Sequence, residues 1–240
     1  MILPPSSGWR TNAFICNVNA LAIADEKGSA MFDTAALLAV LRRAPVVPVL
    51  IIDRLEDAVP LGTALVKGGL PALEVTLRTP AALEAIRAMS AIPGGVVGAG
   101  TVLDRAQAKA AVEAGAKFLV SPGATPDLLD AAVELGVPLL PGVATASEAM
   151  VARDKGYRIV KFFPAGPAGG PKYLQALASP LGEMVFCPTG GVSLDNAPDY
   201  LKLKNVVCVG GSWVAPADAV RNGDWARIEQ LAREAAALAA

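Results

Sequence analysis

Short apolar runs alternate with helical patterns along nearly the whole chain, and this alternation constrains the fold more than any other feature. A new unit begins roughly every 20 to 25 residues, the spacing expected of consecutive strand-helix units. The helical patterns commonly stop at a glycine, as in Ala114-Gly115 and Lys155-Gly156, which is the usual residue just beyond a helix. The pattern therefore predicts an α/β protein.

Eight such units can be placed from residue 31 onward. The predicted strands are 46–52, 73–77, 96–99, 118–121, 138–141, 159–163, 184–187 and 206–209. The predicted helices are 55–67, 80–90, 104–114, 125–135, 147–155, 171–177, 196–201 and 224–238.

Eight units in one continuous array favour a closed (β/α)8 TIM barrel over an open, doubly wound sheet. No GxGxxG motif follows the first strand, as a dinucleotide-binding sheet would require. Hydrophobic residues make up 53% of the chain but aromatic residues only 5%, which suits small aliphatic side chains on buried parallel strands. We expect residues 31–240 to form a single barrel domain.

The chain contains no histidine. This excludes Ser-His and Cys-His nucleophile pairs, His-ligated zinc and acid-base catalysis by imidazole. The net charge is −1 and no basic run is present, so nucleic acid and anionic membranes are not expected partners. No apolar run is long enough to span a membrane. Enzyme chemistry would have to use Lys, Glu, Asp, Arg, Tyr, Cys or backbone groups.

The cysteines Cys16, Cys187 and Cys208 are odd in number and form no CxxC pair. Neither a metal site nor a disulfide framework is expected. We interpret Cys187 and Cys208 as small buried hydrophobic residues, consistent with a reducing cytoplasm.

The first 30 residues do not follow the strand-helix pattern. Arg10 is the only charge ahead of a mildly apolar run that Asn17 and Asn19 interrupt, which argues against a secretory signal. We interpret residues 1–30 as a disordered extension, or as translation assigned to start upstream of Met31.

Lys161 lies within the apolar segment 159–164. Lysine is rarely buried unless it is paired or functional. On a barrel strand it would point inward near the carboxyl end, where active sites of such barrels lie. Burial there disfavours the charged ammonium, and the neutral amine is the form that attacks a ketone. The alternative is a strand-end lysine that reaches solvent or pairs with a glutamate.

Glu74 and Arg78 flank the end of the second predicted strand. An inward carboxylate near a buried lysine can take and return protons while an imine becomes an enamine. The arginine can hold a substrate carboxylate through two parallel hydrogen bonds. The alternative is a simple ion pair at the strand end.

Glycine-rich turns follow three strands, at 98–101, 189–191 and 210–212. The last two follow strands seven and eight, where barrels often bind phosphate through backbone N–H groups. The alternative is that each is only a tight connection. Thr101, Thr189 and Ser212 add a hydroxyl to the three turns.

Six segments resemble the 2-keto-3-deoxy-6-phosphogluconate (KDPG) aldolases, many of which also act as 4-hydroxy-2-oxoglutarate (KHG) aldolases. The segments are EVTLRT (74–79), GAGTVL (98–103), SPG (121–123), KFFPA (161–165), CPTGGVS (187–193) and GGSW (210–213). They occur in order from about Met31 to the C-terminus, and six together are highly specific.

The resemblance implies a role for each matching residue. Lys161 would be the Schiff-base lysine and Glu74 the proton shuttle. The pyruvyl group would contact Arg78, Thr101, Pro122 and Phe163. The phosphate and a hydroxyl of the substrate would contact Thr189, Gly190, Gly191, Gly210, Gly211 and Ser212. The resemblance further implies a cytoplasmic homotrimer that uses no metal or other cofactor and binds only a 2-keto acid and an aldehyde phosphate.

Three alternatives remain open at this point. A metal-dependent aldolase would polarise the ketone with a divalent ion, although no ligand set is evident. A catalytically silent barrel would only bind sugar phosphates. The third alternative is specificity for the galactonate epimer, because the configuration of one substrate hydroxyl is not readable from these motifs.

Overall fold

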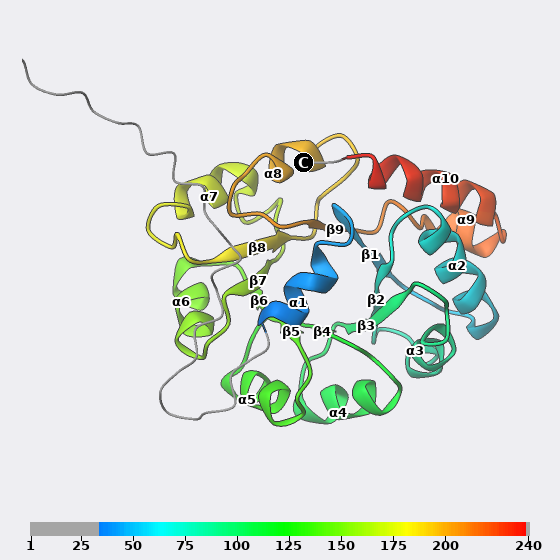
Figure 1. The fold of residues 1–240 in the computed structure, drawn as a ribbon, viewed down its shortest axis with the longest axis horizontal. Helices are drawn as coiled ribbons and strands as arrows, with labels where there is room; N and C mark the ends of the chain where they lie inside the picture. The colour runs from blue at the N-terminus through cyan, green and yellow to red at the C-terminus, as the bar shows by residue number, and fades with distance from the viewer. Residues whose placement is uncertain (1–33, 239–240) are drawn as a thin grey trace, which may run out of the picture.

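Nine parallel strands form the wall of a barrel in the computed structural model, which describes residues 34–238 (Figure 1). The strands are β1 (Val46–Leu50), β2 (Ala72–Thr76), β3 (Val96–Gly100), β4 (Leu119–Val120), β5 (Leu139–Leu140), β6 (Gly142–Val143), β7 (Ile159–Phe162), β8 (Val185–Pro188) and β9 (Val209–Gly211). Six of them pair in the order β5-β4-β3-β2-β1-β9, and the other three in the order β6-β7-β8.

Two local connections close these sheets into a ring. Pro141 alone separates β5 from β6, and single bridges at Phe186↔Val206 and Thr189↔Gly210 join β8 to the chain around β9. Counted with β5 and β6 as one, the ring has the eight staves of a (β/α)8 barrel. The predicted fold class is therefore confirmed.

Two predicted strands differ from the observed ones. The fifth, predicted as 138–141, is interrupted at Pro141, which has no N–H to donate to a ladder. The chain changes partner there: Leu139 pairs with Leu119 of β4, and Gly142 with Lys161 of β7. The eighth, predicted as 206–209, lies later as β9, because residues from Val209 onward pair with β1.

Helices surround the barrel on its outer side (Figure 1). They are α1 (Thr34–Leu41), α2 (Leu55–Lys67), α3 (Ala82–Met89), α4 (Arg105–Glu113), α5 (Pro126–Glu134), α6 (Ala146–Asp154), α7 (Gly170–Leu177), α8 (Ala197–Leu201), α9 (Ala217–Arg221) and α10 (Trp225–Ala236). The short helices α1 and α9 were not predicted. Helix α1 lies over the middle of the ring in Figure 1 and leads directly into β1, so it covers the end of the barrel where the strands begin.

Side-chain caps and glycines set the helix ends. Asp104 accepts from the backbone N–H of Gln107 at the start of α4, and Thr125 likewise caps α5. Gly115 and Gly156 follow α4 and α6 with φ of 103° and 91°, a conformation that favours glycine, as predicted. None of the helices within residues 34–238 is long and apolar enough to cross a membrane.

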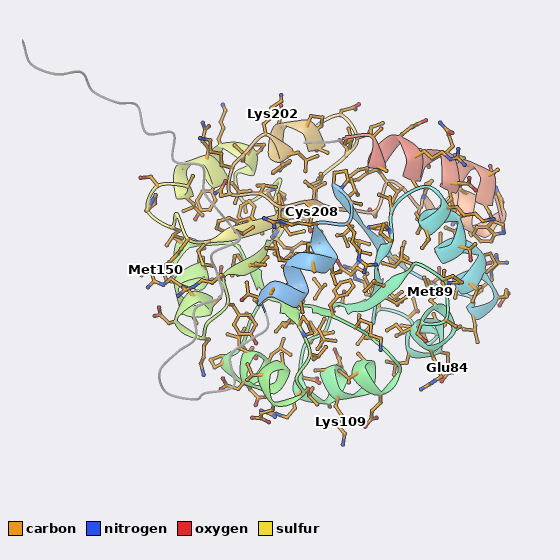
Figure 2. All side chains as sticks on the ribbon, in the orientation of Figure 1. Glu84, Met89, Lys109, Met150, Lys202 and Cys208 are labelled. Carbon is orange, nitrogen blue, oxygen red and sulfur yellow. The ribbon has the colours of Figure 1, made fainter. Side chains whose placement is uncertain are left out.

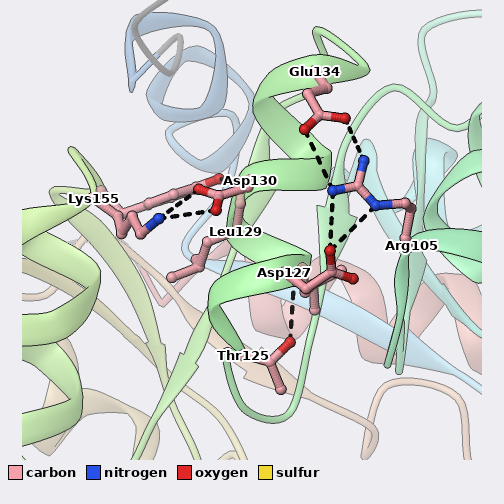
Figure 3. Close-up of polar contacts among 9 residues, drawn as sticks. Arg105, Thr125, Asp127, Leu129, Asp130, Glu134 and Lys155 are labelled. Carbon is pink, nitrogen blue, oxygen red and sulfur yellow. Dashed lines mark hydrogen bonds and ion pairs between the residues drawn. The ribbon is translucent and has the colours of Figure 1, made fainter.

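Ion pairs join neighbouring helices on the outer surface (Figure 3). Arg105 at the start of α4 contacts Asp127 and Glu134 of α5. Lys155, just after α6, lies 2.8 Å from Asp130 of α5. Exposed pairs contribute about 0–1 kcal/mol each. The contacts of α4, α5 and α6 are therefore a modest stabilising feature and lie outside the barrel.

The interior of the barrel is filled by side chains of alternate strand positions. Gly98 illustrates the packing, because a β-carbon there would lie 2.5 Å from the ring of Phe118 on the neighbouring strand. Cys187 and Cys208 are buried, as predicted, with sulfur atoms 3.5 Å apart. Figure 2 shows Cys208 within the ring of strands, whereas Lys109 and Lys202 lie on the outer helices. The predicted extension 1–30, including Cys16, lies outside the described residues.

Candidate active site

Lys161 and Glu74 form an ion pair inside the barrel. The Nζ atom of Lys161 lies 3.1 Å from Oε1 of Glu74, and the two residues are only 3% and 2% exposed. Burying two charges is costly unless they compensate each other, so each group depends on the other. The sequence predicted both residues as inward-facing, and the structure brings them into direct contact.

The two residues reach each other from opposite sides of the barrel. Lys161 is on β7 and Glu74 on β2, and three staves separate these strands in either direction around the ring. Their line of contact divides the barrel into a half with β3, β4 and β5/β6 and a half with β8, β9 and β1. The lysine also lies 5.3 Å from the ring centre of Phe163, within the range of a cation-π contact.

The glycine-rich turn after β3 leaves room for the carboxylate. A β-carbon on Gly100 would lie 2.3 Å from Oε1 of Glu74, so only glycine leaves the carboxylate where it is. The next residue, Thr101, has φ of 58°, which is uncommon for threonine and costs of order 1 kcal/mol. Its hydroxyl accepts a hydrogen bond of 3.0 Å from Nε of Arg78. Arg78 and Thr101 are thus held together at the ends of β2 and β3.

Pro122 lies at the end of β4, against the strand next to Lys161. A β-carbon on Gly142 would lie 2.3 Å from the carbonyl oxygen of Pro122, and Gly142 is the register partner of Lys161. Arg78, Thr101 and Pro122 therefore all follow strands on one side of the Lys161–Glu74 line. No distance from them to Lys161 follows from strand pairing alone.

The two predicted phosphate loops lie side by side on the other side of this line. Thr189 is bridged to Gly210, and a β-carbon on Gly210 would lie 2.3 Å from the Thr189 hydroxyl. The backbone N–H of Gly166 donates to the carbonyl of Gly190 at 2.9 Å, which fixes that loop. Gly190 and Gly191 have φ of 89° and 77°, so both need glycine's conformational freedom.

The turn after β9 is fixed by an aromatic ring. A β-carbon on Gly211 would lie 1.7 Å from the ring of Trp213, so the ring rests directly on the Gly211 backbone. Ser212 between them is exposed. The structure thus gathers Thr189, both glycine pairs and Ser212 at the carboxyl ends of β8 and β9.

Sequence reasoning missed a cavity of about 830 Å³ beside these loops, lined by Ser212 and Trp213 together with Val49, Arg54 and Asp57. The cavity had no signal in the sequence, because its walls come from the two ends of the chain. Within residues 34–238, no cluster of three or more His, Cys, Asp or Glu residues could hold a metal ion.

Burial and the neighbouring thiol of Cys187 affect the other titratable group in the barrel interior. The hydrogen bond from Cys187, together with burial, raises the pKa of Cys208 well above its ordinary value. Cys208 therefore stays a neutral thiol, which is the less nucleophilic form.

A parallel barrel with a buried lysine–glutamate pair, and with glycine loops at the carboxyl ends of its strands, defines the class of the protein as a TIM-barrel enzyme. A family model described as KDPG and KHG aldolase matches residues 37–231. The chain belongs to the KDPG and KHG aldolase family.

Individual relatives agree with this family. The chain is 55% identical to the 2-dehydro-3-deoxy-phosphogluconate aldolase of Dickeya dadantii, over 82% of the chain and 93% of the relative. It is 54% identical to the KHG/KDPG aldolase of Escherichia coli, over 82% of the chain and 92% of the relative.

Solved structures give the same result. The KDPG aldolase of Legionella pneumophila, with pyruvate captured at low pH as a covalent carbinolamine, superposes with a TM-score of 0.81 at 46% identity, covering 83% of this chain and 97% of that one. The Zymomonas mobilis KDPG aldolase with 3-phosphoglycerate has a TM-score of 0.80 at 51% identity, covering 83% and 94%.

Proposed function

We propose that the protein is a class I aldolase that reversibly cleaves KDPG to pyruvate and glyceraldehyde 3-phosphate. It would also cleave 4-hydroxy-2-oxoglutarate to pyruvate and glyoxylate, as the printed name of the Escherichia coli relative suggests. The observation that carries the proposal is the buried contact of 3.1 Å between Lys161 and Glu74. It places a primary amine and a proton acceptor together inside the barrel.

In the proposed mechanism, Lys161 acts as the nucleophile. Glu74 is in position to accept the proton that the ammonium must lose. The neutral Nζ attacks the C2 ketone to form a carbinolamine, which loses water to give an iminium. The captured carbinolamine in the Legionella pneumophila structure is an intermediate of this kind in that protein.

The iminium then accepts the electrons of the C3–C4 bond. Glu74, directly or through water, removes the proton of the C4 hydroxyl, the bond breaks, and the aldehyde leaves. The remaining enamine takes a proton at C3, and hydrolysis of the iminium returns pyruvate and free Lys161. Covalent catalysis replaces an unstable carbanion with this enamine.

The two halves of the barrel mouth suit the two halves of the substrate. Arg78 and Thr101 would hold the pyruvyl carboxylate, with Pro122 and Phe163 packing against the pyruvyl group. The glycine loops would then receive the aldehyde half: Gly190, Gly191, Gly210, Gly211 and Ser212 the phosphate, and Thr189 a hydroxyl or carbonyl. The hydrogen bond between Arg78 and Thr101 supports the first assignment, and the contact between Thr189 and Gly210 the second.

The gluconate substrate is favoured over the galactonate epimer by similarity. Identity is 55% to a phosphogluconate aldolase but 29% to the protein of the solved structure titled native KDPGal. A silent sugar-phosphate-binding barrel would not need the buried ion pair, which costs desolvation energy.

The proposal includes a homotrimer in the cytoplasm, acting without metal or other cofactor. These parts rest on the family resemblance. Light scattering in solution tests the trimer, and turnover in EDTA tests the independence from metal. Loss of activity in EDTA that zinc or magnesium restores would favour the metal-dependent alternative.

Sodium borohydride reduction in the presence of pyruvate, followed by mass spectrometry, tests the mechanism. We expect a stable pyruvate adduct on Lys161 and none in a Lys161→Arg variant. An adduct on another lysine, such as Lys67 or Lys117, or no pyruvate-dependent adduct at all, would overturn the assignment.

A further inference from the structure

The 830 Å³ cavity adjoins the predicted phosphate loop and is large enough for a small organic ligand. Its walls are the turn between β1 and α2 and the turn between β9 and α9. Ser212 belongs to both the cavity and the predicted phosphate loop, whereas neither Lys161 nor Glu74 lines the cavity. The strands beneath are neighbours, because Val47 pairs with Gly210. The cavity is therefore an extension of the aldehyde half of the site.

Arg54 is the positively charged residue of this cavity that the structure holds in a defined orientation. Its Nε and Nη2 atoms donate to the two carboxylate oxygens of Asp57 at 2.8 and 2.9 Å. Nη2 also donates to the carbonyl oxygen of Arg221 at 3.3 Å, which links the two walls. The side chain of Asp57 is 8% exposed and that of Arg54 is 49% exposed. A buried carboxylate thus orients an accessible guanidinium.

Two donors of Arg54 remain uncommitted. Within the described part of the chain, Nη1 has no hydrogen-bond partner and no ion pair. The hydrogen bonds and charge of Asp57 also raise the pKa of Arg54, so the group stays charged. A planar guanidinium with free N–H groups, beside a serine hydroxyl, is the arrangement that proteins use to bind a phosphate monoester.

The charges around the cavity permit such an anion. Asp57 is already neutralised by Arg54, and the remaining lining charges, Asp53 and Arg221, are opposite in sign. The cavity is otherwise lined mainly by apolar side chains such as Val49, which do not compete for the guanidinium.

We propose that Arg54 is a specificity-determining residue that binds the phosphate of the aldehyde half together with Ser212. This inference rests on the proposed function. It means that the phosphate is held by a side-chain cation from the first strand-helix turn, in addition to the backbone of the glycine loops. Phosphorylated substrates would gain from this contact and unphosphorylated ones would not.

The test compares two substrates in an Arg54→Gln variant. We expect kcat/KM for KDPG to fall at least about tenfold, mainly through KM, which equals about 1.4 kcal/mol. The kcat/KM for 4-hydroxy-2-oxoglutarate, which has no phosphate, should change less than about twofold. Inorganic phosphate, used as a competitive inhibitor of KDPG cleavage, should bind more weakly by a similar factor. An Arg54→Lys variant should be intermediate, because it keeps the charge but loses the fork.

Two controls keep the result interpretable. Because Arg54→Gln leaves Asp57 buried without its partner, the double variant Arg54→Gln/Asp57→Asn is measured beside it and should show the same substrate preference. Arg87→Gln is the matched control, since Arg87 is also exposed and paired with an acid three residues away. It should leave both substrates unaffected.

An equal loss on both substrates, or no loss on KDPG, would overturn the role of Arg54. Borohydride trapping with pyruvate separates this outcome from failure of the proposed function. The trapping rate in Arg54→Gln should match that of the unmodified protein, because pyruvate has no phosphate. Absence of the Lys161 adduct in the unmodified protein would instead remove the aldolase mechanism, and the phosphate affinity would still test Arg54.

Discussion

The carboxylate of Glu74 lies directly against the backbone of Gly100, so closely that a β-carbon there would be 2.3 Å from Oε1. The same oxygen is the one that contacts Lys161 at 3.1 Å. The position of the proposed proton shuttle therefore depends on the absence of a side chain one strand away.

Gly100→Ala should move Glu74 away from Lys161. We expect turnover to fall by roughly ten- to a hundredfold, with a destabilisation of about 1–3 kcal/mol from overpacking. Steady-state cleavage of KDPG and urea unfolding measure the two effects. Gly182→Ala is the matched control, since its β-carbon would meet nothing closer than 3.4 Å. Normal turnover in Gly100→Ala would show that the exact position of Glu74 does not matter.

Glu74→Gln keeps the shape of the side chain but removes its ability to take a proton. Turnover should fall by about 10²- to 10⁴-fold, the usual contribution of a general acid-base group. Trapping of pyruvate on Lys161 by borohydride should persist in part, because Glu74 is assigned to proton transfer and not to the covalent bond. A variant that turns over at the full rate would exclude this assignment.

Arg78→Ala should mainly weaken pyruvate binding. Loss of a charged hydrogen-bond partner costs about 1.5–3 kcal/mol, which corresponds to roughly a ten- to hundredfold higher pyruvate concentration for half-maximal trapping. The comparison is Arg87→Ala on α3, whose guanidinium is exposed and contacts only Glu84 in the structure. If both variants trap pyruvate alike, Arg78 does not bind the carboxylate.

The start of α6 should make stability depend on acid pH. The backbone N–H of Ala144, followed by the hydroxyl and N–H of Thr145, lowers the pKa of Glu148 below its ordinary value. Because the folded-state pKa is lowered, this stabilisation is present above the unfolded value and is lost as pH falls through the folded value. Glu148 is exposed, so its contribution is only about 0.5 kcal/mol at pH 7.

Urea unfolding of Glu148→Gln and the unmodified protein measures this effect. The difference in the free energy of unfolding should be largest at pH 7 and should shrink as the pH is lowered below about 4. Glu113→Gln, at an exposed position near the end of α4, should show almost no difference at either pH. A gap for Glu148→Gln that stays constant with pH would mean that the charge of Glu148 contributes nothing.

The apolar and helical periods of the chain were sufficient to predict most of the strands, and the barrel that they form. Local patterns do this because each strand and helix must bury one face, whatever its partners. Lys161 and Glu74 were noticeable for the same local reason, as charges next to or within apolar strands. The interruption at Pro141 and the shift of the last strand to β9 were missed, because strand ends are set by the ladder partner.

What the sequence determined by itself was the fold class and the residue types available for chemistry, since hydrophobic period and the absence of histidine are properties of the chain. Only the closed barrel decided which residues meet. Lys161 and Glu74 are 87 positions apart, and Arg54 and Arg221 are 167 apart. No local pattern encodes such distances, because they follow from ring closure, which brings opposite strands and the first and last turns together.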